Sequence, residues 1–166
     1  EAAWQMALAP LGGPIARGAT KLLSLARRGF GIAGRGLVGA VYAQRTVNWG
    51  GRFSKEGSAT YSKLAGGSIE TIDDLARALS SGRIASSDVA VEFVERAGTR
   101  YIMNTRTAVA LQRAGIPRGQ WLGVNVSGGL QGKLNQRLLR NALTDEGIDY
   151  LITERWRAIY RTRFGR

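Results

Sequence analysis

Apolar residues recur every three or four positions in SIETIDDLARALSSG, residues 68–82, which is the period of an amphipathic helix. Ser68 or Thr71 stands where an N-cap residue belongs, and two aspartates follow in what would be the first helical turn. Gly82 ends the pattern. The stretch therefore predicts a helix that buries one face and opens the main folded unit.

The next stretch, residues 87–103, alternates between apolar and other residues with a period of two. Its sequence is SDVAVEFVERAGTRYIM, in which Ala97-Gly98 supplies a turn between two apolar runs. This pattern is typical of a β-hairpin. A third strand is predicted in QWLGVNVSGG, residues 120–129, which is short, β-branched and closed by glycines.

Two more helices are predicted downstream of the hairpin. NTRTAVALQRAGIP, residues 104–117, combines a polar turn with a short helix that Gly-Ile-Pro ends. LQGKLNQRLLRNAL, residues 130–143, carries leucines at a spacing of four. From Asp149 onward the pattern fits a helix or a strand. The expected fold of residues 68–166 is thus α+β, with a small, mainly antiparallel sheet and packed helices.

The part of the chain before this unit differs from it in composition. Residues 1–52 are Gly-rich and basic, and they predict short helices, of which PIARGATKLLSLARRG, residues 14–29, is basic and amphipathic. This segment is either a helical subdomain packed on the rest or a segment that contacts a membrane or a delivery partner. Residues 53–67 show no helical or strand period and are interpreted as a linker.

Charge and composition narrow the chemistry. The chain has 24 Lys and Arg against 12 Asp and Glu, a net charge of +12, which favours nucleic acid, acidic protein or anionic membrane as partners. It has no Cys and no His, which excludes disulfides, thiolate metal sites, Ser-His-Asp catalysis and histidine-based ribonuclease mechanisms. Acid–base catalysis would fall to Glu, Asp, Lys or Tyr. No motif indicates a metal or a nucleotide cofactor, and none is expected.

The turn Asn104-Thr105-Arg106-Thr107 is the strongest candidate site. If Asn104 or Thr105 caps the helix, the N–H groups of its first turn face outward, beside one guanidinium and two hydroxyls. A phosphate would fit there. The alternative interpretation is a well-capped helix with no ligand.

Further candidates surround this turn. Arg113 lies two helical turns beyond Arg106 on the same face, and a second basic stripe is formed by Lys133, Arg137 and Arg140. Glu92 lies between Val91 and Phe93, so it is expected on the opposite face of the sheet, where it would meet the basic groups as a general base. Trp121 could stack on a base. The alternatives are a solvated helix face, a salt-bridged strand glutamate and a core tryptophan.

The stretches NTRTAVALQRAGIPRGQW and LLRNALTDEGI resemble the C-terminal toxin modules of bacterial polymorphic toxins, of the contact-dependent inhibition, filamentous-haemagglutinin and Rhs types. The resemblance covers about residues 68–148. It implies an antibacterial effector, secreted as the C-terminal part of a larger protein and active in the cytoplasm of a target bacterium. It also implies a cognate immunity protein bound over the active site. The chain begins at Glu1 rather than Met, which agrees with a segment of a longer polypeptide.

Many modules of this kind are nucleases, often directed at transfer RNA. The resemblance thus implies a metal-independent ribonuclease in which Arg106, Arg113 and Lys133 bind the RNA backbone. Thr105, Thr107 or Glu92 would then position or deprotonate the ribose 2′-hydroxyl. Asn104, Arg137, Arg140 and Trp121 complete the expected nucleic-acid surface.

A second similarity and three alternative functions remain open. Residues 68–116 resemble ParB and sulfiredoxin-like domains, in which a D-L-A-x-x-L helix leads to a hairpin and an Arg-containing turn; the usual turn of that group is replaced here by Asn-Thr-Arg-Thr. The alternative functions are a DNA-directed nuclease or a ParB-like nucleic-acid-binding module. A membrane-active toxin carried by residues 1–52 is the third.

Overall fold

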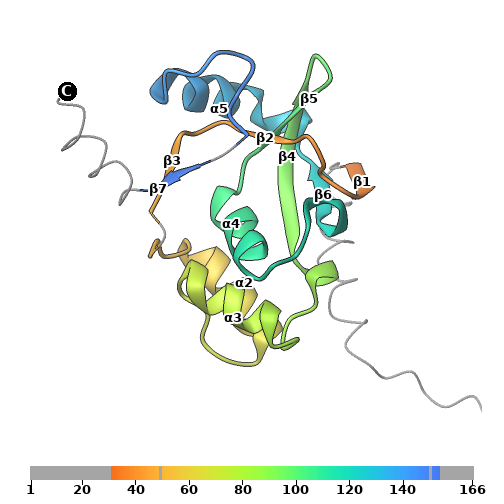
Figure 1. The fold of residues 1–166 in the computed structure, drawn as a ribbon, viewed down its shortest axis with the longest axis vertical. Helices are drawn as coiled ribbons and strands as arrows, with labels where there is room; N and C mark the ends of the chain where they lie inside the picture. Colours follow the sequence, from red (N-terminus) through yellow and green to blue (C-terminus); the bar gives the residue numbers. More distant parts are fainter. Residues whose placement is uncertain (1–30, 49, 150, 154–166) are drawn as a thin grey trace, which may run out of the picture.

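The computed structural model describes residues 31–48, 50–149 and 151–153 (Figure 1). In this part of the chain a five-stranded mixed sheet has the order β1-β6-β4-β5-β2, and a separate two-stranded sheet joins β3 to β7. The strands are β1 Gly31–Arg35, β2 Val41–Tyr42, β3 Thr46–Val47, β4 Ala90–Arg96, β5 Thr99–Ile102, β6 Leu122–Asn125 and β7 Ile152–Thr153. The helices are α2 Lys55–Ala65, α3 Ile72–Ser80, α4 Thr105–Arg113 and α5 Ser127–Arg140, with short 3-10 turns at Ser86–Asp88 and Arg118–Gln120.

The predicted α+β class is confirmed. β4 and β5 form the expected antiparallel hairpin, and β1 pairs antiparallel with β6. β6 runs parallel to β4, because the chain passes through β5 and α4 before it returns to the sheet. β2 pairs with the other side of β5 in a parallel direction. The third predicted strand therefore joins β4 rather than extending the hairpin.

Strand β4 separates two layers of core. Val91 and Phe93 belong to the larger cluster, which contains buried residues of α2, α3 and α4. Ala90 and Val94 belong to the smaller cluster, with Leu134 and other residues of α5. Figure 1 shows α5 on the side of the strands away from α2 and α3. Side chains of β4 thus alternate between a three-helix face and an α5 face, as the period of two predicts.

Helix α3 begins as the sequence predicts. Thr71, one of the two expected N-caps, accepts a hydrogen bond from the Asp74 N–H through its hydroxyl, at 3.2 Å. The Asp74 carboxylate accepts the Thr71 N–H in return, at 3.0 Å, which completes a capping box. Ile72 and Leu75 then face the core with no exposed surface.

The predicted linker is wrong, because residues 55–65 form helix α2. Ser54 caps this helix by accepting the Gly57 N–H at 3.2 Å, and Gly66 ends it with a φ of 65°. Tyr61 is the one side chain that α2 buries fully, so the helix has almost no apolar stripe to produce a period. Tertiary packing of one aromatic ring replaces the amphipathic pattern here.

The predicted boundary at residue 52 is also wrong for the described residues. Residues 31–47 supply β1, β2 and β3 instead of short helices. Leu37 and Tyr42 are buried in the same core as α3 and α4. The predicted amphipathic helix at 14–29 lies outside the described residues. The part of the chain from 31 onward thus contributes directly to the main sheet.

The motif AGIPRGQW, residues 114–121, holds segments together that are far apart in the sequence. The Arg118 guanidinium donates to the carbonyl of Ala40 at 2.7 Å and to that of Asp149 at 3.0 Å. It also lies over the rings of Tyr42 and Trp121, at 5.2 and 5.7 Å from their centroids. The motif therefore holds the segment before β2 and the segment after residue 148 against the same edge of the core.

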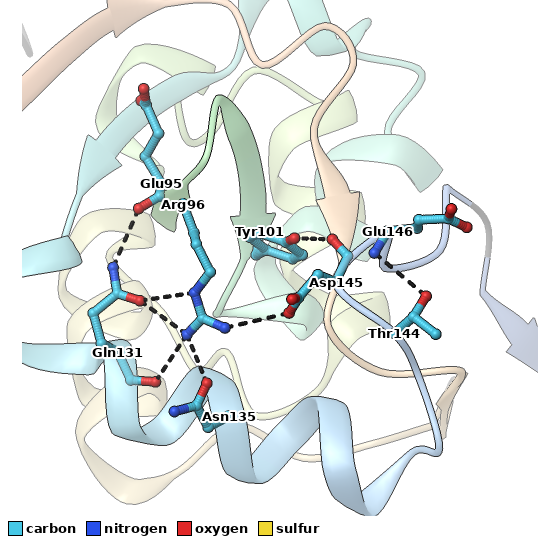
Figure 2. A network of polar contacts seen from close by, with 8 residues as sticks. All are labelled: Glu95, Arg96, Tyr101, Gln131, Asn135, Thr144, Asp145 and Glu146. Atoms are coloured by element: carbon cyan, nitrogen blue, oxygen red, sulfur yellow. Dashed lines mark hydrogen bonds and ion pairs between the residues drawn. The ribbon is translucent and has the colours of Figure 1, made fainter.

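A polar network fixes the tip of the hairpin on helix α5. Figure 2 shows Arg96 between Gln131, Asn135 and Asp145, and its guanidinium donates a 2.7 Å hydrogen bond to the Asn135 side chain. The ion pair with Asp145 is longer, at 3.4 Å. Tyr101 donates its buried hydroxyl to the carbonyl of Asp145. These contacts explain the TDEG stretch as an anchor for β4 and β5.

Candidate anion site at the start of helix α4

Asn104 occupies the N-cap position of α4, but its side chain does not cap the helix. Its amide oxygen accepts the Glu92 N–H at 2.9 Å, and its amide nitrogen donates to the Ala90 carbonyl at 2.9 Å. The Asn104 side chain thus provides β4 with the hydrogen-bond partners that the backbone of β5 no longer supplies once the chain leaves the sheet. The predicted capping by Asn104 is wrong, because these bonds to β4 occupy its amide.

The first turn of α4 consequently has free donors. Within the described residues, the N–H groups of Thr105 and Arg106 have no hydrogen-bond acceptor. The Thr105 hydroxyl, in a residue only 4% exposed, also has no partner there. An unpartnered buried hydroxyl beside unpartnered N–H groups is unusual in a folded protein. The Thr105 hydroxyl is enclosed by the protein, so the free N–H groups of the first turn, at the positive end of the helix dipole, are what favours an anion here.

The two threonines of the turn are buried, which corrects their predicted role. Thr105 and Thr107 have 4% and 3% of their surface exposed, so neither presents its hydroxyl to a ribose in this structure. The Thr107 hydroxyl instead shares a 2.7 Å hydrogen bond with the hydroxyl of Tyr61 on α2. Direct contact of these threonines with substrate is therefore wrong, and Thr107 joins α4 to α2.

Tyr61 is a residue of this region that sequence reasoning missed. Burial raises its pKa to about 12, although the hydrogen bond with Thr107 lowers it and the charge of Glu92 raises it further. The phenol is therefore neutral at physiological pH. The hydrogen bond from the Glu92 N–H to the Asn104 side chain separately places the backbone of Glu92 beside the start of α4. No sequence signal points to Tyr61, because it lies in the segment interpreted as a linker.

Glu92 lies on the sheet face that was predicted for it. Its neighbours Val91 and Phe93 point into the larger core, whereas Glu92 is partly buried on the face that α5 covers. No described side chain forms a salt bridge with it. The carboxylate therefore retains its lone pairs for another proton or donor.

Two arginines share the electrostatic environment of Glu92. Arg137, on α5, is partly buried and donates to the Met103 carbonyl, directly before the turn. Burial lowers the pKa of Arg137, the negative charge of Glu92 raises it, and the positive charge of Arg106 lowers it. Arg106 projects from the first turn of α4 and is exposed. We name the group Glu92, Asn104, Arg106 and Arg137 the α4 site.

The α4 site combines charges that suit a phosphodiester. Two guanidinium groups supply planar N–H donors for phosphate oxygens, and the first turn of α4 adds backbone N–H groups. One carboxylate stands beside them and can accept a proton. Burial is the main cause of the lowered pKa of Arg137, and the positive charge of Arg106 lowers it further. A bound anion would offset both effects.

The remaining predicted residues are not part of this group. Arg113 pairs with Asp73 of α3, so its charge is already countered in the structure. Lys133 and Arg140 are exposed on α5 and form no salt bridge with a described residue. They stay predictions as contacts to the RNA backbone.

Trp121 is a core residue, which corrects its predicted role in base stacking. It has no exposed surface, and its indole N–H donates to the Ile116 carbonyl at 2.8 Å. Arg118 covers its ring. A base cannot stack on an indole that the protein already encloses, so the exposed-aromatic interpretation is wrong.

Comparison with known proteins gives no match. No family model, curated protein or solved structure matches this chain. Among the described residues, no three acidic side chains gather in a way that could hold a metal ion. No helix in that part of the chain is both long and apolar enough to cross a membrane. The geometry of the α4 site is therefore the main basis for a functional proposal.

Proposed function

We propose that this chain is a toxin domain that cleaves RNA at the α4 site without a metal ion. The observation that supports the proposal is that Glu92 and Arg137 are each tied to the start of α4, through Asn104 and the Met103 carbonyl, while Arg106 projects from its first turn. The charges of Glu92 and Arg106 both act on Arg137. Two cations for one phosphate and one carboxylate for one proton are the minimum set for transesterification of RNA.

In this mechanism Glu92 accepts the proton of the ribose 2′-hydroxyl. The 2′-oxygen then forms a bond to phosphorus, and the bond from phosphorus to the 5′-oxygen breaks. The leaving 5′-oxygen takes a proton from water, and protonated Glu92 then gives its proton to the hydroxide that remains. The products are a 2′,3′-cyclic phosphate and a 5′-hydroxyl, so atoms and charges balance without a histidine or a cofactor.

Arg106 and Arg137 stabilise the charge that develops on the pentacoordinate phosphate. Both guanidinium groups stay protonated throughout, so they act as fixed electrostatic donors and not as acids. Arg137 is held by the Met103 carbonyl, which limits its freedom before substrate arrives. Asn104 holds the backbone of Glu92 in the same way, through the hydrogen bond to its N–H.

The biological setting follows from the resemblance to polymorphic toxin modules. The proposed substrate is transfer RNA in a target bacterium, which the protein reaches as the C-terminal part of a secreted polypeptide. An immunity protein that covers the α4 site would protect the producing cell, and an acidic surface would complement Arg106 and Arg137. The basic sequence before residue 31 would contact the membrane or a delivery protein during entry.

Glu92→Gln and Arg106→Ala test the proposal. Each variant should retain the fold and cut RNA about 100-fold more slowly than the parent, because each removes a group that acts on the transition state. Lys63→Ala is the matched control, since it removes an exposed positive charge on α2, away from the α4 site. The measurement is the appearance of discrete transfer-RNA fragments on a gel.

The outcomes separate the competing functions. Full activity of Arg106→Ala with unchanged fragments would contradict the site. Intact RNA together with a nicked plasmid would identify a DNA-directed nuclease. Intact RNA and DNA with salt-dependent binding to any duplex would identify a binding module. Leakage of anionic vesicles without damage to nucleic acid would identify a membrane-active toxin.

A further inference from the structure

Hydrogen bonds join Gly50 and Gly51 to Asn48 in a turn, and Gly51 lies close to the guanidinium group of Arg106. The Gly51 N–H donates to the Asn48 carbonyl at 2.9 Å, and the Gly50 N–H donates to the Asn48 side chain at 3.0 Å. The Gly51 carbonyl in turn accepts the N–H of Ile72, the first residue of α3, at 3.3 Å. The turn is therefore fixed internally and anchored to a buried helix.

Gly51 has no room for a side chain on the side of Arg106. A Cβ atom there would lie 2.7 Å from the Asn48 carbonyl oxygen and 3.2 Å from Nε of Arg106. The first distance is shorter than real Cβ contacts, and the second is tighter than most. The residue is also buried. The bare backbone of Gly51 thus sets how closely the guanidinium approaches the turn.

We infer that Gly51 is a positioning residue for Arg106 in the α4 site. The inference deepens the proposed function and rests on it, since it assigns a cause to the orientation of the phosphate-binding arginine. An exposed arginine loses considerable rotamer freedom when it binds a phosphate. If the backbone of Gly51 limits the rotamers of Arg106 before the phosphate binds, the affinity for the anion increases without a new contact to it.

Gly51→Ala tests this inference, with Gly50→Ala as the matched control. A Cβ at Gly50 would meet only the Asn48 side chain, at an ordinary 3.7 Å. The probe is a fluorescein-labelled single-stranded oligonucleotide with 2′-deoxy sugars, which the proposed reaction cannot cleave. We expect Gly51→Ala to weaken its binding about tenfold, as Arg106→Ala does, because the charge-assisted contact is displaced. Gly50→Ala should bind as the parent does.

A double variant separates positioning from general damage. If Gly51 acts through Arg106, Gly51→Ala adds no further loss of affinity in a chain that already carries Arg106→Ala. Additive losses, or parental binding by Gly51→Ala, would overturn the inference. With an RNA substrate, Gly51→Ala should lower kcat and also raise KM, because Arg106 contacts the phosphate both in the bound substrate and in the transition state. Simple loss of folded protein would lower the apparent kcat and leave KM unchanged.

A second measurement keeps the inference distinct from the proposed function. Exchange of the Arg106 Nε–H with solvent, followed by NMR, reports on the guanidinium without any ligand. Faster exchange in Gly51→Ala than in Gly50→Ala supports positioning even if the parent neither binds nor cuts RNA. If Gly51→Ala does not fold, Asn48→Ala loosens the turn by removing the acceptor of the Gly50 N–H. Unchanged exchange in the folded variant would overturn the inference.

Discussion

The Asn104 side chain completes the hydrogen bonding of β4 and also holds the backbone of Glu92 in the α4 site. Strand β5 leaves the sheet after Ile102, and the backbone of β4 would lose its partner at that point. The Asn104 amide supplies one acceptor and one donor, to the Glu92 N–H and the Ala90 carbonyl. Only an amide offers both at this spacing. The residue that frees the start of α4 therefore also fixes the backbone of Glu92.

Asn104→Ala should destabilise the protein by about 3 kcal/mol, because two buried backbone groups lose their partners. The rate of RNA cleavage should also fall at temperatures where the variant is still folded, because the Glu92 N–H loses its hydrogen bond to the Asn104 side chain. Urea unfolding and a cleavage assay on the same sample measure the two effects. Asn104→Asp is a comparison that keeps the acceptor for the Glu92 N–H but turns a charged oxygen toward the Ala90 carbonyl in place of the donor. Parental stability of Asn104→Ala would contradict the role of the amide.

At the scale of elements, the start of α3 is stabilised by hydrogen bonds among residues that are neighbours in the sequence. The Asp74 carboxylate accepts N–H groups from Glu70 and Thr71 and also pairs with Arg77. Partial burial raises the pKa of Asp74, but the hydrogen bonds from Thr71 outweigh it and lower the pKa to about 2. The carboxylate is therefore more stable in the folded chain than in the unfolded one.

This lowered pKa predicts a pH dependence of stability. The contribution of Asp74 is complete above 3.8, the ordinary pKa of an aspartate, and is lost as the pH falls toward about 2. Asp74→Asn should thus be less stable than the parent by about 1 kcal/mol at neutral pH, which is typical of a lost capping interaction. Urea unfolding of both proteins from neutral to acid pH measures the difference. A gap that stays constant down to about pH 2 would contradict this role.

The polar hairpin network illustrates a different source of element stability. Arg96 contacts Gln131 and Asn135 of α5, which are far away in sequence (Figure 2). Such contacts depend on the docking of two finished elements and not on either element alone. The ion pair of Arg96 with Asp145 gives the RNALTDEGI stretch, residues 140–148, a structural use in the same network.

At the scale of the whole molecule, Arg118 joins distant parts of the chain. Its hydrogen bonds reach Ala40 and Asp149, and its guanidinium covers the rings of Tyr42 and Trp121. The packing of Arg118 thus gives the motif AGIPRGQW a structural role. The α4 site receives Arg106 and Arg137 from elements that these contacts help to keep in register.

Arg118→Ala should lower the free energy of unfolding by about 3 kcal/mol, because two carbonyl partners and two ring contacts are lost together. Arg83→Ala, at an exposed position, should change it by less than about 0.5 kcal/mol. Thermal or urea unfolding distinguishes the two variants. Equal free energies of unfolding for the two variants would show that the contacts of Arg118 do not stabilise the fold.

The sequence by itself determined the elements whose signals are local. The capping residues and apolar period of α3, the alternation in β4 and the Gly-Ile-Pro stop after α4 are each contained in a few neighbouring residues, so the helices, the hairpin and the α+β class were predictable. The alternation also placed Glu92 on its face of the sheet. The basic composition indicated an anionic partner, which stays a prediction.

Only the tertiary structure decided which residues meet. Helix α2 lacks an apolar period because it buries Tyr61 alone, and β1 and β2 are stabilised by neighbours that are far along the chain. Trp121 and Thr107 became interior residues for the same reason. The grouping of Glu92 with Arg106 and Arg137, and the approach of Gly51 to Arg106, depend on how β4, α4 and α5 pack. Local sequence cannot encode such distances, because they arise from contacts between segments that close only when the whole core forms.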